Sequence, residues 1–375
     1  VREHVVTVIF PEFDEGFIAE RIAQDYLQGM PPATQTQVAG MLIELHRELA
    51  KLRPEITISL RDVQEACARV WALGSDANAA ARLGAVYSSY LGLVGPLERT
   101  VLSYMADITY GVSLKDAERA YAEATGFNEV LGTLRSQAAL DPAGLVLTDS
   151  TVDLAEQVHG FVKSRKGKVG VQRAVPLLAG KTALFIEGPP GRGKDLLLEA
   201  ELKAMGYVDG DSEAGRAAPA ERRCYFVTAS VHYQETLDTI ARAQREGALV
   251  VVRELNLLPS GILEGRLNDV LTGNATLGFA LLSTMNEVGR SGREKLSSAL
   301  LNRSQVLRAE DYPQTELHEI AQSTVSRLGL GANDHSPVQN LVSAHVWIRA
   351  QLRAAGSPLQ LTTRELRRVL AHYGR

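Results

Sequence analysis

One glycine-rich octapeptide has the residue types and spacing to do chemistry. Residues 188–195 read GPPGRGKD, and the apolar run 183–186 comes directly before them. A helix is predicted after Lys194, so the octapeptide connects a buried strand to a helix. Glycines let backbone N–H groups face a phosphate, and the helix N-terminus adds partial positive charge. The sequence predicts a nucleotide phosphate site formed by Gly188, Pro189, Pro190, Gly191, Arg192, Gly193, Lys194, Asp195 and Leu196.

The metal-holding positions of this site depart from what hydrolysis requires. A hydroxyl side chain at the end of the loop would help to hold Mg²⁺, and the chain has the carboxylate of Asp195 there. After the apolar run 248–252, an Asp-Glu pair would hold the metal and polarise the attacking water. The chain has Arg253-Glu254 instead. The sequence therefore predicts no metal site at Asp195 and Arg253, and Glu254 is the candidate catalytic carboxylate.

The two departures are expected to compensate each other. A helix start and the tip of the neighbouring strand would share a metal ion, so Asp195 and Arg253 should lie side by side. An arginine and a carboxylate form a charge-assisted ion pair of good geometry. We expect this pair to stand where the metal would lie, with Arg253 in the role of the cation. The alternative is that the two positions changed independently in a unit that does not need ATP.

Two further polar residues follow later strands. Asn286 ends the stretch LLSTMN and would lie at a strand tip beside the phosphate loop, where it could orient water or a γ-phosphate. A helix predicted at 295–301 would carry Arg303 to the edge of the domain. There it could stabilise charge on a neighbouring subunit's nucleotide. The alternative for Arg303 is a surface salt bridge.

The elements that must position these residues belong to two kinds of region, one all-helical and one in which strands and helices alternate. Apolar positions with helical spacing dominate roughly the first 130 residues and return after residue 311. Between them lie short apolar runs that alternate with helices, which is typical of a parallel sheet covered on both faces. The predicted strands are five, at 182–186, 224–228, 248–252, 277–283 and 304–308.

Two pairs of segments resemble each other in the same order. Residues 13–24 resemble residues 312–322, and residues 56–70 resemble residues 359–373. The segments of each pair are amphipathic, so chance similarity is the alternative. The pairs otherwise indicate a duplicated helical unit, once before and once after the α/β core.

Taken together, four stretches resemble the AAA+ ATPases, most of all the branch that contains midasin and MoxR. They are GPPGRGKD, VVVRELNLLPSGILEGRLNDVL, LLSTMNEVGRSGREKLSSALLNRS and LTTRELRRVL. By this resemblance Lys194 is the Walker A lysine, Glu254 the Walker B glutamate and Asn286 sensor 1. Arg303 is the arginine-finger candidate and Arg364 is sensor 2. Asp195, Arg253 and Glu287 depart from the family's Thr or Ser, Asp and Pro.

The resemblance implies an α/β P-loop core with a parallel five-stranded sheet and all-α lid domains before and after it. The expected division is a lid of a preceding unit at 1–75, a helical extension and linker at 76–145, the core at 146–310 and its own lid at 311–375. Because the sequence begins with Val1 inside a lid, we expect a fragment of a longer chain that strings such units into a ring. The implied partners are neighbouring AAA+ units and an unknown macromolecular client.

Composition limits the other classes of function. The net charge is −4 and the pI about 6.1, so nucleic acid is an unlikely partner, although residues 163–173 form a basic run. The two cysteines favour a reducing compartment, and a cytoplasmic location is expected. No apolar run reaches the length of a membrane span.

Three functions therefore remain open at the level of sequence. The first is a nucleotide-binding unit for ATP or ADP with weak or absent hydrolysis and no need for Mg²⁺. The second is a live ATP hydrolase that uses Glu254 and holds the metal by another group. The third is a scaffold unit whose pocket is closed by Asp195 and Arg253.

Overall fold

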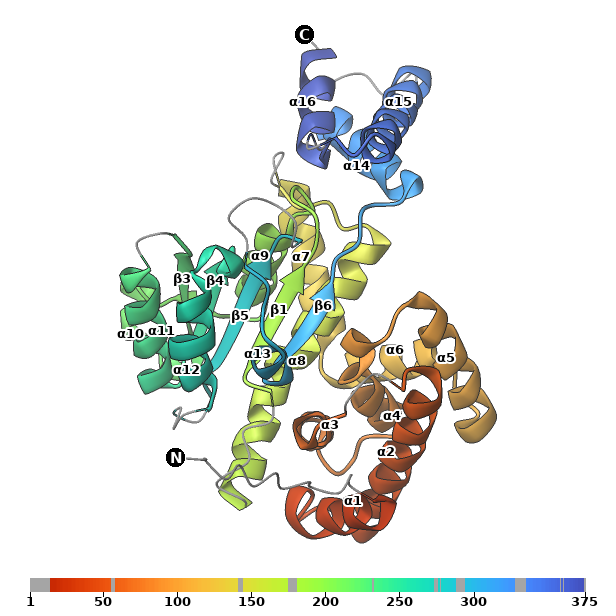
Figure 1. Ribbon diagram of the computed structural model, residues 1–375, viewed down its shortest axis with the longest axis vertical. Helices are drawn as coiled ribbons and strands as arrows, with labels where there is room; N and C mark the ends of the chain where they lie inside the picture. Colours follow the sequence, from red (N-terminus) through yellow and green to blue (C-terminus); the bar gives the residue numbers. More distant parts are fainter. Residues whose placement is uncertain are drawn as a thin grey trace, which may run out of the picture.

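The computed structural model describes residues 14–54, 58–140, 144–174, 181–230, 233–272, 276, 278–287, 294–327, 335–357, 359 and 361–373. Three parts follow one another along the chain: a group of helices, a sheet covered by helices, and a helical unit near the C-terminal end (Figure 1). The last of these parts, α14–α16, lies beyond one end of the strands and is called the lid below.

The first part consists of helices that pack on one another. They are α1 (Glu15–Arg21), α2 (Pro32–Leu52), α3 (Leu60–Leu73), α4 (Ala79–Ser88), α5 (Pro96–Tyr110), α6 (Leu114–Ala124) and α7 (Phe127–Leu140), with a π-helical turn (Ile22–Tyr26) and a 3-10 turn (Leu91–Leu93). Local signals start several of them: Asn78 accepts a hydrogen bond from the N–H of Ala81, and Ser113 accepts one from Asp116. One hydrophobic cluster extends from Ile22 to Tyr121 and so crosses the division predicted at residue 75.

The sheet has six parallel strands, and the predicted count of five is wrong. Its order is β2-β3-β4-β5-β1-β6. The strands are β1 (Ala183–Glu187), β2 (Val208–Asp209), β3 (Arg223–Thr228), β4 (Leu249–Arg253), β5 (Ala280–Met285) and β6 (Ser304–Arg308). The missed strand, β2, has two residues at the edge of the sheet, too few to produce an apolar run. It is held by parallel pairing with β3, which only the tertiary fold supplies.

Helices cover both faces of this sheet, as the near-continuous apolar strands predict. On one face, β-strand side chains pack against α7, α8 (Asp149–Ala174) and α9 (Lys194–Ala204). On the other face they pack against α11 (Gln234–Glu246), α12 (Asn268–Thr272) and α13 (Ser298–Asn302). The short α10 (Glu213–Ala217) follows β2. The central strands β1, β4 and β5 are thereby buried on both sides, which fixes the strand tips that build the site.

The lid is a small helical unit with its own core. It consists of α14 (Gln314–Arg327), α15 (His335–Ala354) and α16 (Thr363–Tyr373). Its buried side chains form one cluster, and Val146 from the segment before α8 packs against this cluster. The proposed duplication of this unit at the start of the chain remains a prediction, and residues 1–13 of that region lie outside the described residues. Within the described part of the chain, no helix is long and apolar enough to cross a membrane.

A buried polar network joins the first part to the sheet. Arg69 on α3 donates to Glu65 at 3.3 Å and to Gln305 of β6 at 2.7 Å. Glu65 also accepts a hydrogen bond from Ser164 of α8 at 3.1 Å, and Gln305 donates to the carbonyl of Ser88. Arg69 and Glu65 are both fully buried. These contacts connect α3 and α4 to α8 and to the edge strand β6.

Candidate functional site

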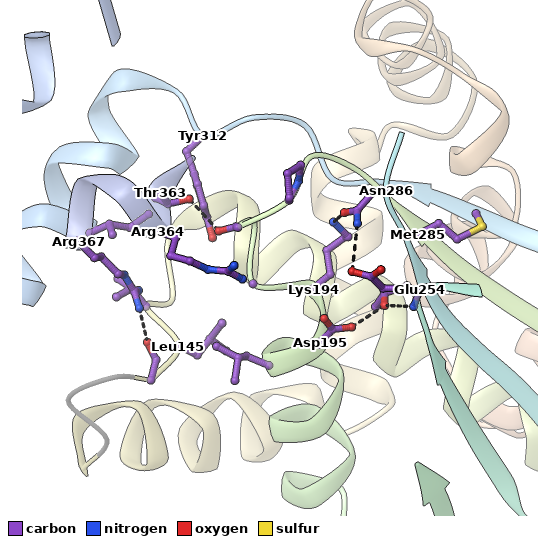
Figure 2. A pocket seen from close by; sticks show the side chains of 18 residues that line it. Leu145, Lys194, Asp195, Glu254, Met285, Asn286, Tyr312, Thr363, Arg364 and Arg367 are labelled. Carbon is purple, nitrogen blue, oxygen red and sulfur yellow. Dashed lines mark hydrogen bonds between the residues drawn. The ribbon is translucent and has the colours of Figure 1, made fainter. Parts of the chain in front are cut away.

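A cavity of about 350 Å³ lies where the phosphate loop, the strand tips and the lid meet. Figure 2 shows Lys194, Glu254 and Asn286 on one side of it and Arg364 and Arg367 of the lid on the other. Ligands of open α/β sheets bind in such a crevice outside the carboxyl ends of the strands. The cavity therefore lies where the sequence placed a phosphate site. It is lined by Gly144, Leu145, Val146, Pro190, Gly191, Gly193, Lys194, Asp195, Leu196, Glu254, Thr284, Met285, Asn286, Tyr312, Ile320, Thr363, Arg364 and Arg367.

The loop between β1 and α9 needs its glycines. Gly191 and Gly193 have φ of +77° and +78°, a region that L side chains rarely adopt. Gly193 is also the residue before the first turn of α9. A Cβ on Gly188 would lie 2.2 Å from the carbonyl oxygen of Ala309, so no side chain fits there. The sequence thus folds the loop tightly against the end of β6 and leaves the N-terminus of α9 facing the cavity.

The amine of Lys194 is buried and points back into its own loop. It donates to the carbonyls of Gly188 at 2.7 Å and Pro189 at 2.8 Å, and to Oδ1 of Asn286 at 3.1 Å. An ammonium group has three donors, so these contacts use all of them. A phosphate bound at this loop must take over at least one of these hydrogen bonds.

Burial lowers the pKa of Lys194 to about 8. The loss of hydration disfavours the charged amine, and the nearby carboxylates of Asp195, Glu254 and Glu287 offset only part of this effect. The amine therefore changes charge within a pH range that is accessible to binding experiments.

We expect phosphate-dependent binding to weaken above about pH 8. The amine loses its charge there in the unliganded protein, whereas a bound phosphate favours the ammonium form, so binding takes up a proton. The affinity for ADP should fall by up to about tenfold per pH unit between about pH 8 and pH 9.5. Isothermal titration calorimetry in two buffers measures both the affinity and the proton uptake. The arginine of Lys194→Arg keeps its charge over this pH range, so this variant should lose the pH dependence of the ADP affinity. An equal pH dependence in both proteins would mean that Lys194 is not the group that takes up the proton.

Glu254 follows β4 in a strained backbone conformation. Its φ is +55°, and no other described residue except glycine has a positive φ. Its N–H donates to the hydroxyl of Thr284 at 3.3 Å, and its carboxylate accepts a hydrogen bond from Nδ2 of Asn286 at 3.4 Å. Asn256 in turn donates to the carbonyl of Asn286 at 2.7 Å. Residues in such conformations cluster at functional sites, because the surrounding structure must hold them.

The ion pair predicted between Asp195 and Arg253 is not formed. Arg253 pairs with Glu199, one turn further along α9, and both side chains are partly exposed. The carboxylate of Asp195 instead accepts a hydrogen bond from the hydroxyl of Thr284 at 2.5 Å. The long arginine side chain reaches past the start of α9 toward solvent, where its charge keeps more hydration. Thr284, which sequence reasoning missed, satisfies Asp195 from β5.

The lid contributes residues that lie far from the loop in sequence. Thr363 donates to the carbonyl of Gly191 at 2.7 Å, and the exposed side chain of Arg364 is directed into the cavity (Figure 2). Arg367, which the sequence did not single out, enters beside it and donates to the carbonyl of Gly144 at 3.3 Å. The cavity therefore has two lid guanidinium groups opposite the amine of Lys194.

Part of the cavity lining is apolar and was not predicted. Leu145 and Val146 line the cavity from the segment before α8, Tyr312 from the segment before α14 and Ile320 from α14. None of these residues was singled out as a site residue in the sequence. The cavity thus combines cationic and apolar lining residues.

Arg303 lies outside this cavity. It follows α13, and its guanidinium donates to the carbonyl of Ala299 at 2.7 Å. Burial lowers the pKa of Arg61 on α3, and the charge of Arg303 lowers it further, so the two guanidinium groups lie near each other. Most of the predicted site residues line this cavity, but Gly188, Pro189, Arg192 and Arg303 do not, and neither does Arg253.

The chain is similar in part to a known protein. No protein-family model matches the chain. Over 162 residues, which cover 38% of this chain, it is 39% identical to midasin from Dictyostelium discoideum. The aligned stretch corresponds to about 3% of the length of that protein. This similarity points to a midasin-like relationship over part of the chain.

Proposed function

We propose that this chain is a nucleotide-binding AAA+ module with degenerate metal positions that works within a ring-forming remodelling protein. The observation that carries this proposal is the cavity between a glycine-rich loop and a lid, with Lys194 on the loop side and two lid arginines opposite. The similarity to midasin supports the family, and the parallel sheet with covering helices agrees with it. Neighbouring units of the same type are the proposed partners in the ring, and the client is a macromolecule.

The cavity has the chemistry that a mononucleotide requires. Lys194, the N-terminus of α9 and the two lid arginines Arg364 and Arg367 offer positive charge for phosphates. Leu145 and Ile320 are among its apolar lining residues, which suit the flat face of a base. ATP or ADP is therefore the proposed ligand.

The residues present do not fit a firmly held Mg²⁺. Asp195 is engaged by the hydroxyl of Thr284, and an arginine, Arg253, stands where a second metal-orienting carboxylate would be required. In the part of the chain that the structure describes, no group of three or more His, Cys, Asp or Glu side chains could hold a metal ion. Binding should rest on the loop backbone, Lys194 and the lid.

We expect ATP to bind equally well with and without the metal. Calorimetric titrations of ATP in EDTA and in millimolar Mg²⁺ should give dissociation constants within about threefold of each other, because no protein group gains a metal contact. ATP binding that strictly requires Mg²⁺ would contradict the proposal of degenerate metal positions. Complete absence of binding under both conditions would instead favour a nucleotide-free scaffold unit.

A live ATP hydrolase is the second candidate, favoured by the geometry of Glu254. Its carboxylate lies at the strand tip, and Asn286 contacts both this carboxylate and Lys194. Such a carboxylate can orient and polarise an attacking water. For Arg303, the proposed role of reaching a neighbouring subunit's nucleotide requires that it leave its present contacts beside α3.

A further inference from the structure

Arg192 belongs to the phosphate loop, yet its side chain points away from the cavity and is buried. Its Nε donates to the carbonyl of Glu310 at 2.8 Å, in the segment that connects the core to the lid. Its two terminal nitrogens donate to Thr151 at 3.1 Å and to Ser150 at 2.5 Å, at the start of α8. The guanidinium also lies 3.7 Å from the ring centroid of Tyr312. Every nitrogen of the guanidinium therefore has a partner outside the loop.

The same contacts continue into the lid. Ser150 donates through its hydroxyl and its N–H to the carboxylate of Glu316, in the first turn of α14. Tyr312, which lies just before α14, donates through its hydroxyl to the carbonyl of Arg192 at 3.0 Å. Arg192, Tyr312 and Glu316 are all buried. The loop, the core–lid connection and α14 are thus joined by one set of buried polar contacts.

A second contact from the lid holds the neighbouring glycine. Thr363, at the start of α16, donates to the carbonyl of Gly191. Thr362 packs so closely that a Cβ on Gly191 would lie 2.9 Å from it. The two peptides that flank Arg192 are therefore both held, one by Thr363 of α16 and the other by Tyr312 just before α14.

We propose that Arg192 is a positioning residue that couples the phosphate loop to the lid. The peptides around Arg192 form the cradle that a phosphate must enter, and the guanidinium cannot turn with them unless its buried partners move too. Leaving a buried guanidinium unpaired is strongly unfavourable, so loop and lid change conformation together. The coupling is reciprocal: a ligand on the loop sets the lid orientation, and the lid orientation sets the affinity of the loop.

This inference rests on the proposed nucleotide binding but has a consequence without any ligand. Removing the guanidinium releases the connection between Glu310, Ser150 and the loop. The distance between core and lid should then become more variable in the unliganded protein. Nucleotide should also narrow the distribution of core–lid distances in the parent protein, and it should fail to narrow this distribution in a variant that lacks the guanidinium of Arg192.

The test measures core–lid distances with two spin labels in the full chain. Glu235→Cys on α11 and Ala344→Cys on α15 place labels at exposed positions, whereas the native Cys67 and Cys224 are buried. Double electron–electron resonance is recorded without ligand and with ADP, for the parent and for Arg192→Gln. Tyr312→Phe is a milder second variant, which deletes only the hydroxyl that contacts Arg192. Arg222→Ala is the control, an exposed arginine of the core that contacts only the carbonyl of Met205.

We expect broader unliganded distances in Arg192→Gln, a smaller broadening in Tyr312→Phe, and none in Arg222→Ala. The ADP affinity of Arg192→Gln should fall roughly tenfold, within the usual range of coupling between sites. Unchanged distance distributions in both Arg192→Gln and Tyr312→Phe would overturn the proposal. If the parent binds no ADP but the unliganded distances broaden as expected, the proposed function fails while the positioning role of Arg192 stands.

Discussion

Lys194→Ala should lower the affinity for ADP and ATP about 100-fold, equivalent to about 2.7 kcal/mol of binding free energy. The amine is a buried cation at the wall of the cavity, bonded to Asn286 and near Glu254 at the strand tips. A charge-assisted contact to phosphate in such a partly dehydrated site is stronger than one in water. Lys194 is the only cation of the loop that lines the cavity, because Arg192 points away.

Thermal unfolding measures this loss directly. At a ligand concentration of about 100 times the dissociation constant, binding stabilises the parent by about 2.7 kcal/mol. The same ligand concentration should stabilise Lys194→Ala by only about 0.4 kcal/mol. Lys203→Ala is the matched control, an exposed lysine in the last turn of the same helix. Equal ligand-induced shifts in parent and Lys194→Ala would place the phosphates elsewhere.

The same variant separates binding from hydrolysis. If the parent has a measurable ATPase rate that both Lys194→Ala and Glu254→Gln abolish, the unit is an active ATP hydrolase. The proposal that its metal positions are degenerate is then wrong. If the parent binds ATP with no rate above background, Glu254→Gln should leave the affinity nearly unchanged, because the glutamine keeps a hydrogen bond to Asn286. The two outcomes require only one assay and one titration.

Arg69→Ala should destabilise the protein by about 3–5 kcal/mol, the largest effect expected on folding. Arg69 and Glu65 are both fully buried, and Arg69 also donates to Gln305 of the edge strand. Removing the guanidinium takes the ion-pair partner away from the buried carboxylate of Glu65, whereas the hydrogen bond from the hydroxyl of Ser164 stays. It also removes the polar connection between α3 and β6. Urea unfolding monitored by circular dichroism measures the change in the free energy of unfolding.

Two companion variants identify the cause of this loss. Replacing both partners, as in Glu65→Leu with Arg69→Met, should recover most of the stability, because no charge is then left buried without a partner. Arg119→Ala removes an arginine from an exposed ion pair with Asp116 and should change stability by less than about 0.5 kcal/mol. A double variant as unstable as Arg69→Ala would mean that lost packing, rather than the loss of the cation beside Glu65, causes the effect.

Several features were available from sequence because they are local. The run of buried residues before Gly188, the glycines and the lysine at the start of a helix predict a phosphate loop wherever they occur. The apolar strand at 248–252 was recognisable because a central parallel strand is buried on both faces. The edge strand β2 was missed, since two residues that pair only with β3 leave no pattern.

What only the tertiary structure decided is which side chains meet. The sequence alone determined the loop, the helix behind it and the changed residues Asp195 and Arg253. It could not assign their partners, because a long arginine side chain on a strand tip reaches either Asp195 or Glu199, which are one helical turn apart. Packing of β5 beside β1 brings Thr284 to Asp195 and leaves Arg253 to Glu199. The direction of Arg192, away from the cavity and toward the lid, is likewise set by groups that lie 41 and 118 residues away along the chain.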